Sequence, residues 1–449
     1  MKSALAKLTI YLFFVALLLN FFCLLIYSKN TQALALLALC CPLSLLVAER
    51  PRFTWYHGLF LLFIGYLILH KTLVFPEEKI FTFSSSTVLA FLAGMAAFQL
   101  LKDRNMNFMY LMNPLLLFVV TGVVALTAFG YIPYERIFDG PRLRLLTHHP
   151  NILGMMPAIC LLTGLSFLLR KDFSDSLSPL LTTAGNGRLV AFLYQAAKSK
   201  VFILCGMLLS LVVLFLALSK SALFSTAIVG GLFCAYVAST RWGLLRSTAL
   251  CVILALCAVA AWQLAPIEQQ RKELFYHEVL SNALTPWKMP TYISRIPFWE
   301  SAILAVKEKP LCGVGVGGFT DFHRKRVLED YDRLVSIYGK GMIDRDTLVV
   351  SRPHNTYLLW FAETGIIGGV LFCLLFFTPL FYCLKKRTLC GEMGLILAVF
   401  AIAFFFDTFV GGSGRSVAFG GTIIFMTLGY FSGILGQSQT AEPVRSVQN

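Results

Sequence analysis

Charged residues are scarce in this sequence. Only 14% of the 449 residues are Asp, Glu, Lys or Arg, whereas 57% are hydrophobic, and the mean hydropathy is +0.75. A soluble domain carries roughly a quarter charged residues, so this composition excludes a soluble protein. Apolar runs of about 20 residues recur along the chain, and each is long enough to cross a bilayer as a helix. The sequence therefore predicts an all-α, polytopic membrane protein.

Acidic residues are the rarer of the two charge types. The 23 Asp and Glu are outnumbered by 38 Lys and Arg, which gives a formal net charge of +15. In a membrane protein such an excess bears on insertion topology and on anionic lipid head groups. We therefore expect membrane lipids, and no nucleic acid, among the partners.

Paired cysteine motifs are absent. The chain has 12 cysteines but no Cys-x-x-Cys and no Cys/His spacing of the kind that binds zinc. Most of the cysteines lie inside apolar runs, where a thiol packs as a small hydrophobic side chain. We expect neither a disulfide framework nor a metal or other cofactor.

About twelve apolar runs are predicted to span the membrane. They are residues 8–27, 32–48, 54–70, 87–101, 109–130, 152–169, 201–218, 222–239, 247–264, 355–384, 393–410 and 416–435. Lys2 and Lys7 precede the first run as in a signal peptide, but no small-x-small cleavage site follows, so we expect a retained span. The chain then divides into nine spans in residues 1–264, a loop in 265–353, three spans in 354–436 and a disordered cytoplasmic tail in 437–449.

The short basic loops set the orientation. With a cytoplasmic N-terminus, every predicted cytoplasmic connection carries Lys or Arg, as at Glu49–Arg52 and Lys385–Arg387, which satisfies the positive-inside rule. The loop 265–353 then faces the periplasm of a bacterial inner membrane. Within this mostly helical loop, Pro297–Lys309 is predicted as an amphipathic helix, and Pro310 with the glycines that follow it as a tight turn.

Several cations lie on the side where the positive-inside rule disfavours them. They are Arg142, Arg144, Lys220, Arg295, Arg352 and Arg415, with His148 and His149 near the first two. A polyanionic head group such as a pyrophosphate would explain their presence. Ordinary alternatives stay open, because Lys220 can snorkel to the interface and Arg142 and Arg144 can be solvated loop charges.

Two carboxylates are predicted inside spans. Glu363 lies nine residues past His354, roughly 13 Å deeper at about 1.5 Å per residue. Asp407 lies near the outer end of the span 393–410. Buried carboxylates in membrane helices are costly and often functional, although they can equally pair with interior polar groups and hold the bundle together.

His354 carries the most specific chemical prediction. It precedes Asn355, a good helix N-cap, at the outer mouth of a span, so the free N–H groups of that helix point toward the same place. Arg352 is close in sequence. A neutral imidazole can take a proton from a hydroxyl near pH 7, so we predict a general base beside phosphate-binding groups.

Three motifs together resemble the O-antigen ligase and polymerase superfamily, whose members are multispanning glycan transferases with a large periplasmic loop. They are Ser294-Arg295 before a Trp-containing helix, the turn Pro310-Leu311-Cys312-Gly313-Val314-Gly315, and His354-Asn355 leading to Glu363-Thr364-Gly365. The resemblance covers roughly residues 200–430, and His149-Pro150-Asn151 also resembles the family's entry to a middle span. One position departs from the pattern. Where the family commonly has Ser-Arg, this chain has Ser219-Lys220, which keeps the charge but loses the bidentate fork.

The resemblance implies a glycan donor linked to undecaprenyl diphosphate and a lipid A-core acceptor. On this basis we expect His354 and Arg295 to be catalytic, in a metal-independent displacement with inversion. Expected diphosphate ligands are Lys220, Arg352, Arg142, Arg144 and Arg415. Expected supporting residues are Asn355, His149, Asn151, Glu363 and Asp407.

Other functions stay open at this point. An O-antigen or exopolysaccharide polymerase would carry the same motifs. A protein-targeting oligosaccharyltransferase is disfavoured because no additional outer domain follows the last span. A major-facilitator-like transporter would also have about twelve spans, but Glu49–Arg52 lacks that family's Gly/Asp/Arg pattern. A transporter also has no need for so long a loop.

Overall fold

The computed structural model describes most of the chain. It covers residues 2–26, 31–47, 53–74, 80–101, 112–139, 142–143, 150–169, 199–237, 293–338, 353–385, 391–410 and 417–441, with a few single positions between 249 and 273. The described elements are helices, apart from one antiparallel hairpin of two-residue strands, β1 (Phe138–Asp139) and β2 (Arg142–Leu143). The predicted helical class is confirmed, with this hairpin as an addition.

The helices follow the predicted apolar runs. In chain order they are α1 (Lys2–Ile26), α2 (Thr31–Val47), α3 (Trp55–Leu69) with its π-helical continuation η1 (His70–Val74), α4 (Ile80–Leu101), α5 (Met112–Ala128), α6 (Tyr134–Ile137), α7 (Pro150–Leu169), α10 (Lys200–Leu216), α11 (Lys220–Val237), α15 (Ile296–Glu308), α16 (Phe319–Tyr338), α18 (Thr356–Lys385), α19 (Gly391–Phe406) and α20 (Val417–Ala441). The amphipathic helix predicted over Pro297–Lys309 is α15. α20 continues past residue 436, where the tail was predicted to begin, to Ala441.

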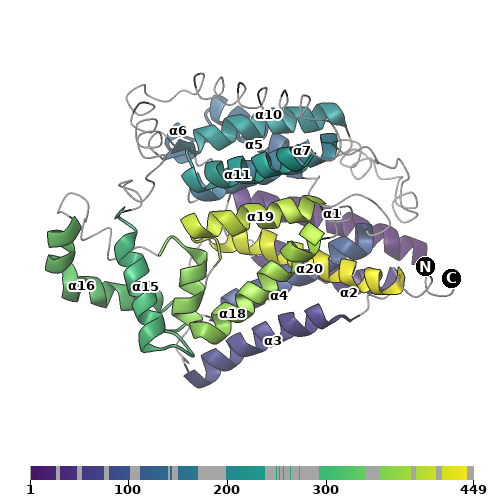
Figure 1. Ribbon diagram of the computed structural model, residues 1–449. Coiled ribbons are helices and arrows are strands. Elements are labelled where there is room, and N and C mark those ends of the chain that lie inside the picture. The colour runs from purple at the N-terminus through teal and green to yellow at the C-terminus, as the bar shows by residue number, and fades with distance from the viewer. Residues whose placement is uncertain are drawn as a thin grey trace.

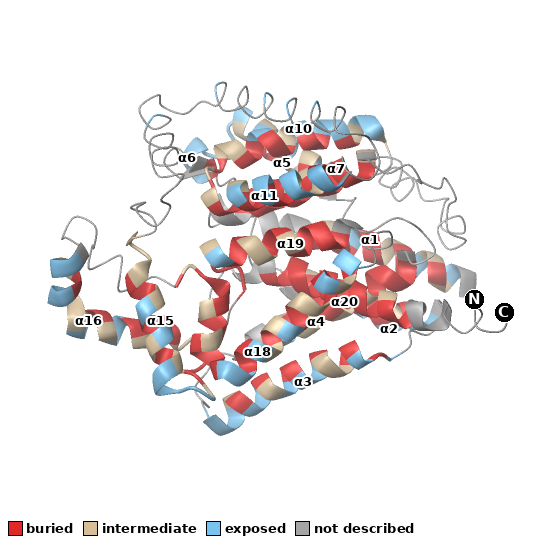
Figure 2. Cartoon of the chain, viewed as in Figure 1, coloured by how far each residue is buried: buried red, intermediate tan, exposed pale blue. Residues whose placement is uncertain are grey.

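The apolar helices lie where spans were predicted. Within the described residues, two helices are long and apolar enough to cross a membrane, Trp55–Val74 and Thr356–Lys385, and nine shorter apolar helices accompany them. The predicted span 247–264 falls almost wholly outside the described residues. Figure 2 shows exposed positions along α3 and α10, and large apolar side chains such as Leu61 on α3 and Leu208 on α10 are among the exposed residues. Outward apolar surface of this kind is consistent with a multi-pass membrane protein.

Two groups of helices make up the bundle (Figure 1). α5, α7, α10 and α11 lie together at the top of the view, with α10 packed on both α5 and α7. Below them, α4 packs against both α2 and α20. α19 joins the groups, since it contacts α7 and α11 as well as α18. α15 and α16 stand at one end of the bundle, where α15 packs along α18.

Aromatic rings fill the core around α18. Phe63 of α3 packs against Trp360 at 5.5 Å between ring centroids, and Trp360 stacks on Phe372 at 4.8 Å. Phe376 meets Phe404 of α19 at 5.0 Å. Such ring pairs add to the burial that stabilises a core, so α18 is held between α3 and α19 along its length.

α18 is interrupted at Gly365. This residue has φ 67° and ψ −170°, a conformation that is essentially restricted to glycine. The span predicted over 355–384 is therefore present, but its helix is broken at this point. Backbone groups on either side of the interruption need partners from outside the helix, because an unpaired group in a membrane is costly.

The turn after Pro310 supplies those partners. Three backbone hydrogen bonds join the two segments: the Val314 N–H to the Ala362 carbonyl (2.9 Å), the Gly315 N–H to the Glu363 carbonyl (3.0 Å) and the Ile366 N–H to the Pro310 carbonyl (2.8 Å). Gly313 has φ 67°, and a Cβ there would lie 2.6 Å from the backbone nitrogen of Gly365. The predicted tight turn is thus present, and its glycines allow it to lie directly on α18.

Gly365→Ala is expected to destabilise the protein. A Cβ at this position would lie 2.6 Å from the backbone nitrogen of Cys312, and the conformation disfavours any side chain. The free energy of unfolding should fall by about 1–3 kcal/mol. Gly65→Ala on α3 is the matched control, because a Cβ there meets nothing within 4 Å. Thermal melting in detergent should show a lower Tm for Gly365→Ala alone, and equal Tm values would contradict the expectation.

Candidate active site

His354 and Asp407 meet at the end of the bundle where α18 begins and α19 ends. Nδ1 of His354 lies 3.0 Å from Oδ1 of Asp407. The imidazole is 32% exposed and the carboxylate 10% exposed, so a substrate can reach the histidine while the carboxylate stays shielded. The predicted base and one predicted supporting carboxylate therefore form one unit.

The backbone at His354 is unusual. Its φ is 46°, in the left-handed region that non-glycine residues seldom adopt and that is concentrated at functional sites. Among the described residues, Leu218 is the other non-glycine residue with positive φ, at 48°. Leu218 directly precedes Ser219 and Lys220. Both strained positions thus adjoin residues that the sequence assigned to the site.

Asp407 is fixed by its own turn and by the start of α18. The Thr408 N–H donates to Oδ1 of Asp407 at 2.8 Å. Thr356, which is fully buried, donates from Oγ1 to the Asp407 carbonyl at 2.9 Å and accepts from the Phe409 N–H at 3.1 Å. These bonds hold the carboxylate at a set distance from the imidazole.

The contact with Asp407 decides the tautomer of His354. An ionised carboxylate can only accept a hydrogen bond, so Nδ1 carries the proton and the lone pair is on Nε2. Nε2 can then take a proton from a hydroxyl, and the carboxylate stabilises the imidazolium that forms. The pair has the arrangement of a general base with its orienting acid.

Arg295 lies next to the pair formed by His354 and Asp407. It directly precedes α15, and its Nη1 donates to the carbonyl of Phe406 at 2.5 Å. Burial lowers the pKa of the Arg295 guanidinium, and the charge of Asp407 acts in the opposite direction. Arginine stays charged at neutral pH in either case, and it has five N–H donors. The donors that do not serve Phe406 can bind an anion next to His354.

α15 is tied to the residues before α18. Nε1 of Trp299 donates to the Pro353 carbonyl at 2.8 Å. The ring of Phe298 packs edge-on against His354, with centroids 6.3 Å apart. The helix that follows Arg295 therefore contacts both His354 and the residue before it.

The start of α11 belongs to the same end of the bundle. Ser219 caps α11, since its Oγ accepts from the Ala222 N–H at 3.4 Å. One turn past Lys220, Phe224 stacks on Phe406 at 6.1 Å, and Phe406 is the residue that accepts the bond from Arg295. Lys220 was predicted to bind the diphosphate, and that role requires it to lie at the same end of the bundle as Arg295 and His354.

Asn355 and Glu363 have different surroundings. The predicted N-cap is present, because Oδ1 of Asn355 accepts from the Leu358 N–H at 3.0 Å. Its Nδ2 also approaches the Phe405 carbonyl at 3.5 Å. Glu363 is buried beside the interruption of α18, further along that helix than His354. The structure therefore brings Asp407, and not Glu363, to the imidazole.

The other predicted residues are not described to the level of their side chains. Arg144, His149, Arg352 and Arg415 lie outside the described residues. Arg142 and Asn151 belong to β2 and α7, whose backbones are described.

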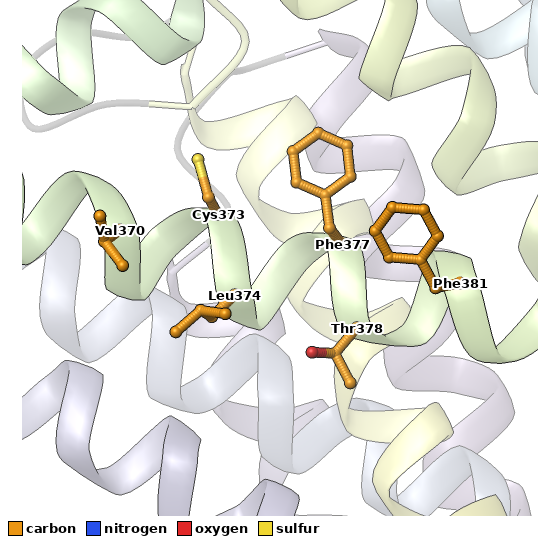
Figure 3. A pocket seen from close by; sticks show the side chains of 6 residues that line it. All are labelled: Val370, Cys373, Leu374, Phe377, Thr378 and Phe381. Carbon is orange, nitrogen blue, oxygen red and sulfur yellow. The ribbon is translucent and has the colours of Figure 1, made fainter.

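An apolar groove follows α18 beyond the interruption. It is lined by Val370, Cys373, Leu374, Phe377, Thr378 and Phe381, all from that helix (Figure 3). This lining suits hydrocarbon and offers no acid or base. Within the described part of the chain, no three His, Cys, Asp or Glu side chains gather as metal ligands would.

Three site contacts were not predicted from the sequence. They are the Phe406 carbonyl, the Thr356 hydroxyl and the Trp299 indole. A carbonyl acceptor leaves no sequence pattern, because every residue has one. The position of Thr356 directly after His354-Asn355 was the one available indication.

Two comparisons with known proteins give a match. Residues 205–373 match the family described as O-antigen ligase. Over this segment the chain is similar to the O-antigen ligase and polymerase superfamily. An uncharacterized protein of Haemophilus influenzae is 30% identical over 93 residues, which are 21% of this chain and 21% of that protein. The chain thus matches about a fifth of that relative's length.

The O-antigen ligase segment holds most of the site. It includes Lys220, Arg295, His354 and Gly365 and ends before Asp407. Members of the superfamily are membrane-integral enzymes that transfer glycosyl groups. The family resemblance found from the motifs is confirmed, and Asp407 joins the site from outside the matched segment.

Proposed function

We propose that the protein is an O-antigen ligase of the bacterial inner membrane. It transfers a glycan from undecaprenyl diphosphate to a sugar of lipid A-core on the periplasmic face. The observation that carries the proposal is the 3.0 Å contact of His354 with Asp407, next to the partly buried guanidinium of Arg295. The family match supports the class of substrate.

The reaction is a single displacement with inversion at the anomeric carbon. Nε2 of His354 takes the proton of the acceptor hydroxyl as its oxygen bonds to the anomeric carbon. The bond from that carbon to the phosphate oxygen breaks, and undecaprenyl diphosphate leaves with the electron pair. Asp407 stabilises the imidazolium, which later returns its proton to solvent.

Cations stabilise the leaving diphosphate. Arg295 presents its remaining donors beside His354, and Lys220 at the start of α11 adds a point charge. Arg142, Arg144, Arg352 and Arg415 complete the proposed phosphate ligands. Fixed charges aimed at the leaving group lower the barrier because they need no reorganisation during the reaction. We therefore expect activity in the presence of a chelator.

A reconstituted assay tests the proposal. Purified protein is supplied with undecaprenyl-diphosphate glycan and lipid A-core, with EDTA present. Glycan on lipid A-core is the expected product. Longer lipid-linked glycan with unmodified lipid A-core would instead identify a polymerase, and proton-coupled uptake without transfer would identify a transporter.

Arg295→Lys should lower the transfer rate about tenfold, because lysine keeps the charge but loses the planar fork. Initial rates at saturating donor measure the loss. Arg333→Lys on α16 is the matched control, since Arg333 forms an exposed ion pair with Glu300 at 3.6 Å and should tolerate the change. Equal rates for the two variants would exclude Arg295 from phosphate binding.

A further inference from the structure

α3 donates side-chain hydrogen bonds to two backbone carbonyl groups of α18. The hydroxyl of Tyr56 donates to the Leu375 carbonyl at 2.7 Å. The helical partner of that carbonyl would be residue 379, which is a proline without an N–H. The hydroxyl of Tyr66 donates to the Thr364 carbonyl at 2.6 Å, beside the interruption of α18. Both bonds run from a tyrosine hydroxyl to a backbone carbonyl, but only the Tyr66 bond lies beside the interruption of α18.

His70 adds a bond to the loop at the interruption. Its Nε2 lies 2.6 Å from the Cys312 carbonyl, and since a carbonyl only accepts, Nε2 must be the donor. The side chain is buried, and His70 is the first residue of η1. Tyr66 therefore holds α18 and His70 holds the turn at the same place. We call this assembly the joint, defined by Tyr66, His70, Cys312 and Thr364.

Hydrogen bonds join α15 and its following turn to the first part of α18 at both ends. At one end, Trp299 donates to the Pro353 carbonyl. At the other end, the turn that follows α15 is bonded to α18 at the joint. Between the ends, small and apolar side chains pack closely: Ala302, Ala305, Leu359 and Ala362 are buried in one cluster. The two segments thus form one unit that carries Arg295 and His354.

This unit meets α19 at the active site. Arg295 bonds to the Phe406 carbonyl, and His354 bonds to Asp407. Thr364 lies ten residues past His354, which is about 15 Å at the helical rise. A small rotation of the unit at the joint would therefore displace His354 from Asp407.

We infer that Tyr66 and His70 are positioning residues for the transfer reaction. Their hydrogen bonds fix the joint in place and thereby fix the distance between His354 and Asp407. Neither residue touches the reacting groups. The effect on rate rests on the proposed function, whereas the effect on geometry does not.

The chain offers a matched set of variants. Tyr66→Phe and His70→Ala each remove one bond of the joint. His70→Gln keeps a side-chain N–H within reach of the Cys312 carbonyl and should restore parental behaviour. Tyr56→Phe removes a bond of the same kind between the same two helices, away from the interruption, and is the control.

Cross-linking measures the geometry directly. Asn355→Cys and Phe405→Cys are introduced together, because the side chain of Asn355 contacts the Phe405 carbonyl. A short thiol-reactive cross-linker is applied, and the product is identified by mass spectrometry. The cross-linking rate should fall several-fold in the Tyr66→Phe and His70→Ala backgrounds, and stay parental with Tyr56→Phe or His70→Gln. Parental cross-linking in all backgrounds, or an equal fall with Tyr56→Phe, would overturn the inference.

Transfer kinetics without the added cysteines complete the test. We expect Tyr66→Phe and His70→Ala to lower kcat about tenfold with KM unchanged, since misplaced catalytic groups reduce the chemical step. A parental kcat despite reduced cross-linking would also overturn the inference. If the parental protein transfers no glycan while cross-linking falls as expected, the proposed function fails and the geometric role of the joint stands.

Discussion

His354→Ala is expected to lower the rate of glycan transfer by about 10³-fold, because it removes the group that accepts the proton of the attacking hydroxyl. The loss should appear in kcat, since the diphosphate ligands that bind the donor are unchanged. Nε2 of His354 is free for this task because Nδ1 is engaged by Asp407 at 3.0 Å. Single-turnover rates with labelled donor measure the chemical step separately from product release.

Two controls separate a chemical loss from a folding loss. The variant should melt within a few degrees of the parental protein, since the histidine is partly exposed. Added imidazole should restore part of the rate by occupying the space that the side chain leaves. A folded His354→Ala protein that transfers glycan at the parental rate would rule out the base assignment.

Asp407→Asn is expected to lower the transfer rate by about 10²-fold. The amide oxygen can keep the hydrogen bonds to His354 and to the Thr408 N–H, which share Oδ1 of Asp407. The substitution therefore removes mainly the negative charge, and the imidazolium that forms during the reaction is no longer stabilised. The measurement is kcat at saturating donor and acceptor.

The control for this substitution is Asp330→Asn on α16. Asp330 is a carboxylate with cationic partners of its own, at 3.8 Å from Arg326 and 3.6 Å from Arg333. Its loss should leave kcat within about twofold of parental, as is usual for exposed ion pairs. Similar losses at Asp407 and Asp330 would indicate general destabilisation instead of a catalytic charge.

The sequence predicted the parts of the site that lie in local motifs. His354 was predicted from its place before an N-cap at the mouth of a span. Arg295 was predicted as a cation on the outer side and from the family resemblance, in which an arginine precedes a Trp-containing helix. The positions of the apolar helices also followed, because hydrocarbon thickness fixes the length of a span.

The sequence could not predict the pairing of His354 with Asp407. The two residues are 53 positions apart, and Glu363 was an equally plausible partner on composition alone. The choice depends on how α19 packs against α18, which is a tertiary property. Thr356 contributes to this packing, since its hydroxyl donates to the Asp407 carbonyl.

The interruption of α18 was missed for a different reason. A glycine in an apolar run is compatible with a continuous membrane helix, so Gly365 alone does not predict a break. The break is stabilised because Val314, Gly315 and Tyr66 donate hydrogen bonds to backbone carbonyls beside it. Those partners come from two distant segments, and no local pattern connects them.

The most direct test of the account is a double-mutant cycle on His354 and Asp407. The rates of the parental protein, His354→Ala, Asp407→Asn and the double variant are compared in the reconstituted transfer assay. If the two residues act as one unit, the double variant should be no slower than His354→Ala alone. Losses that multiply in the double variant would show that Asp407 acts independently of His354 and would contradict the proposed mechanism.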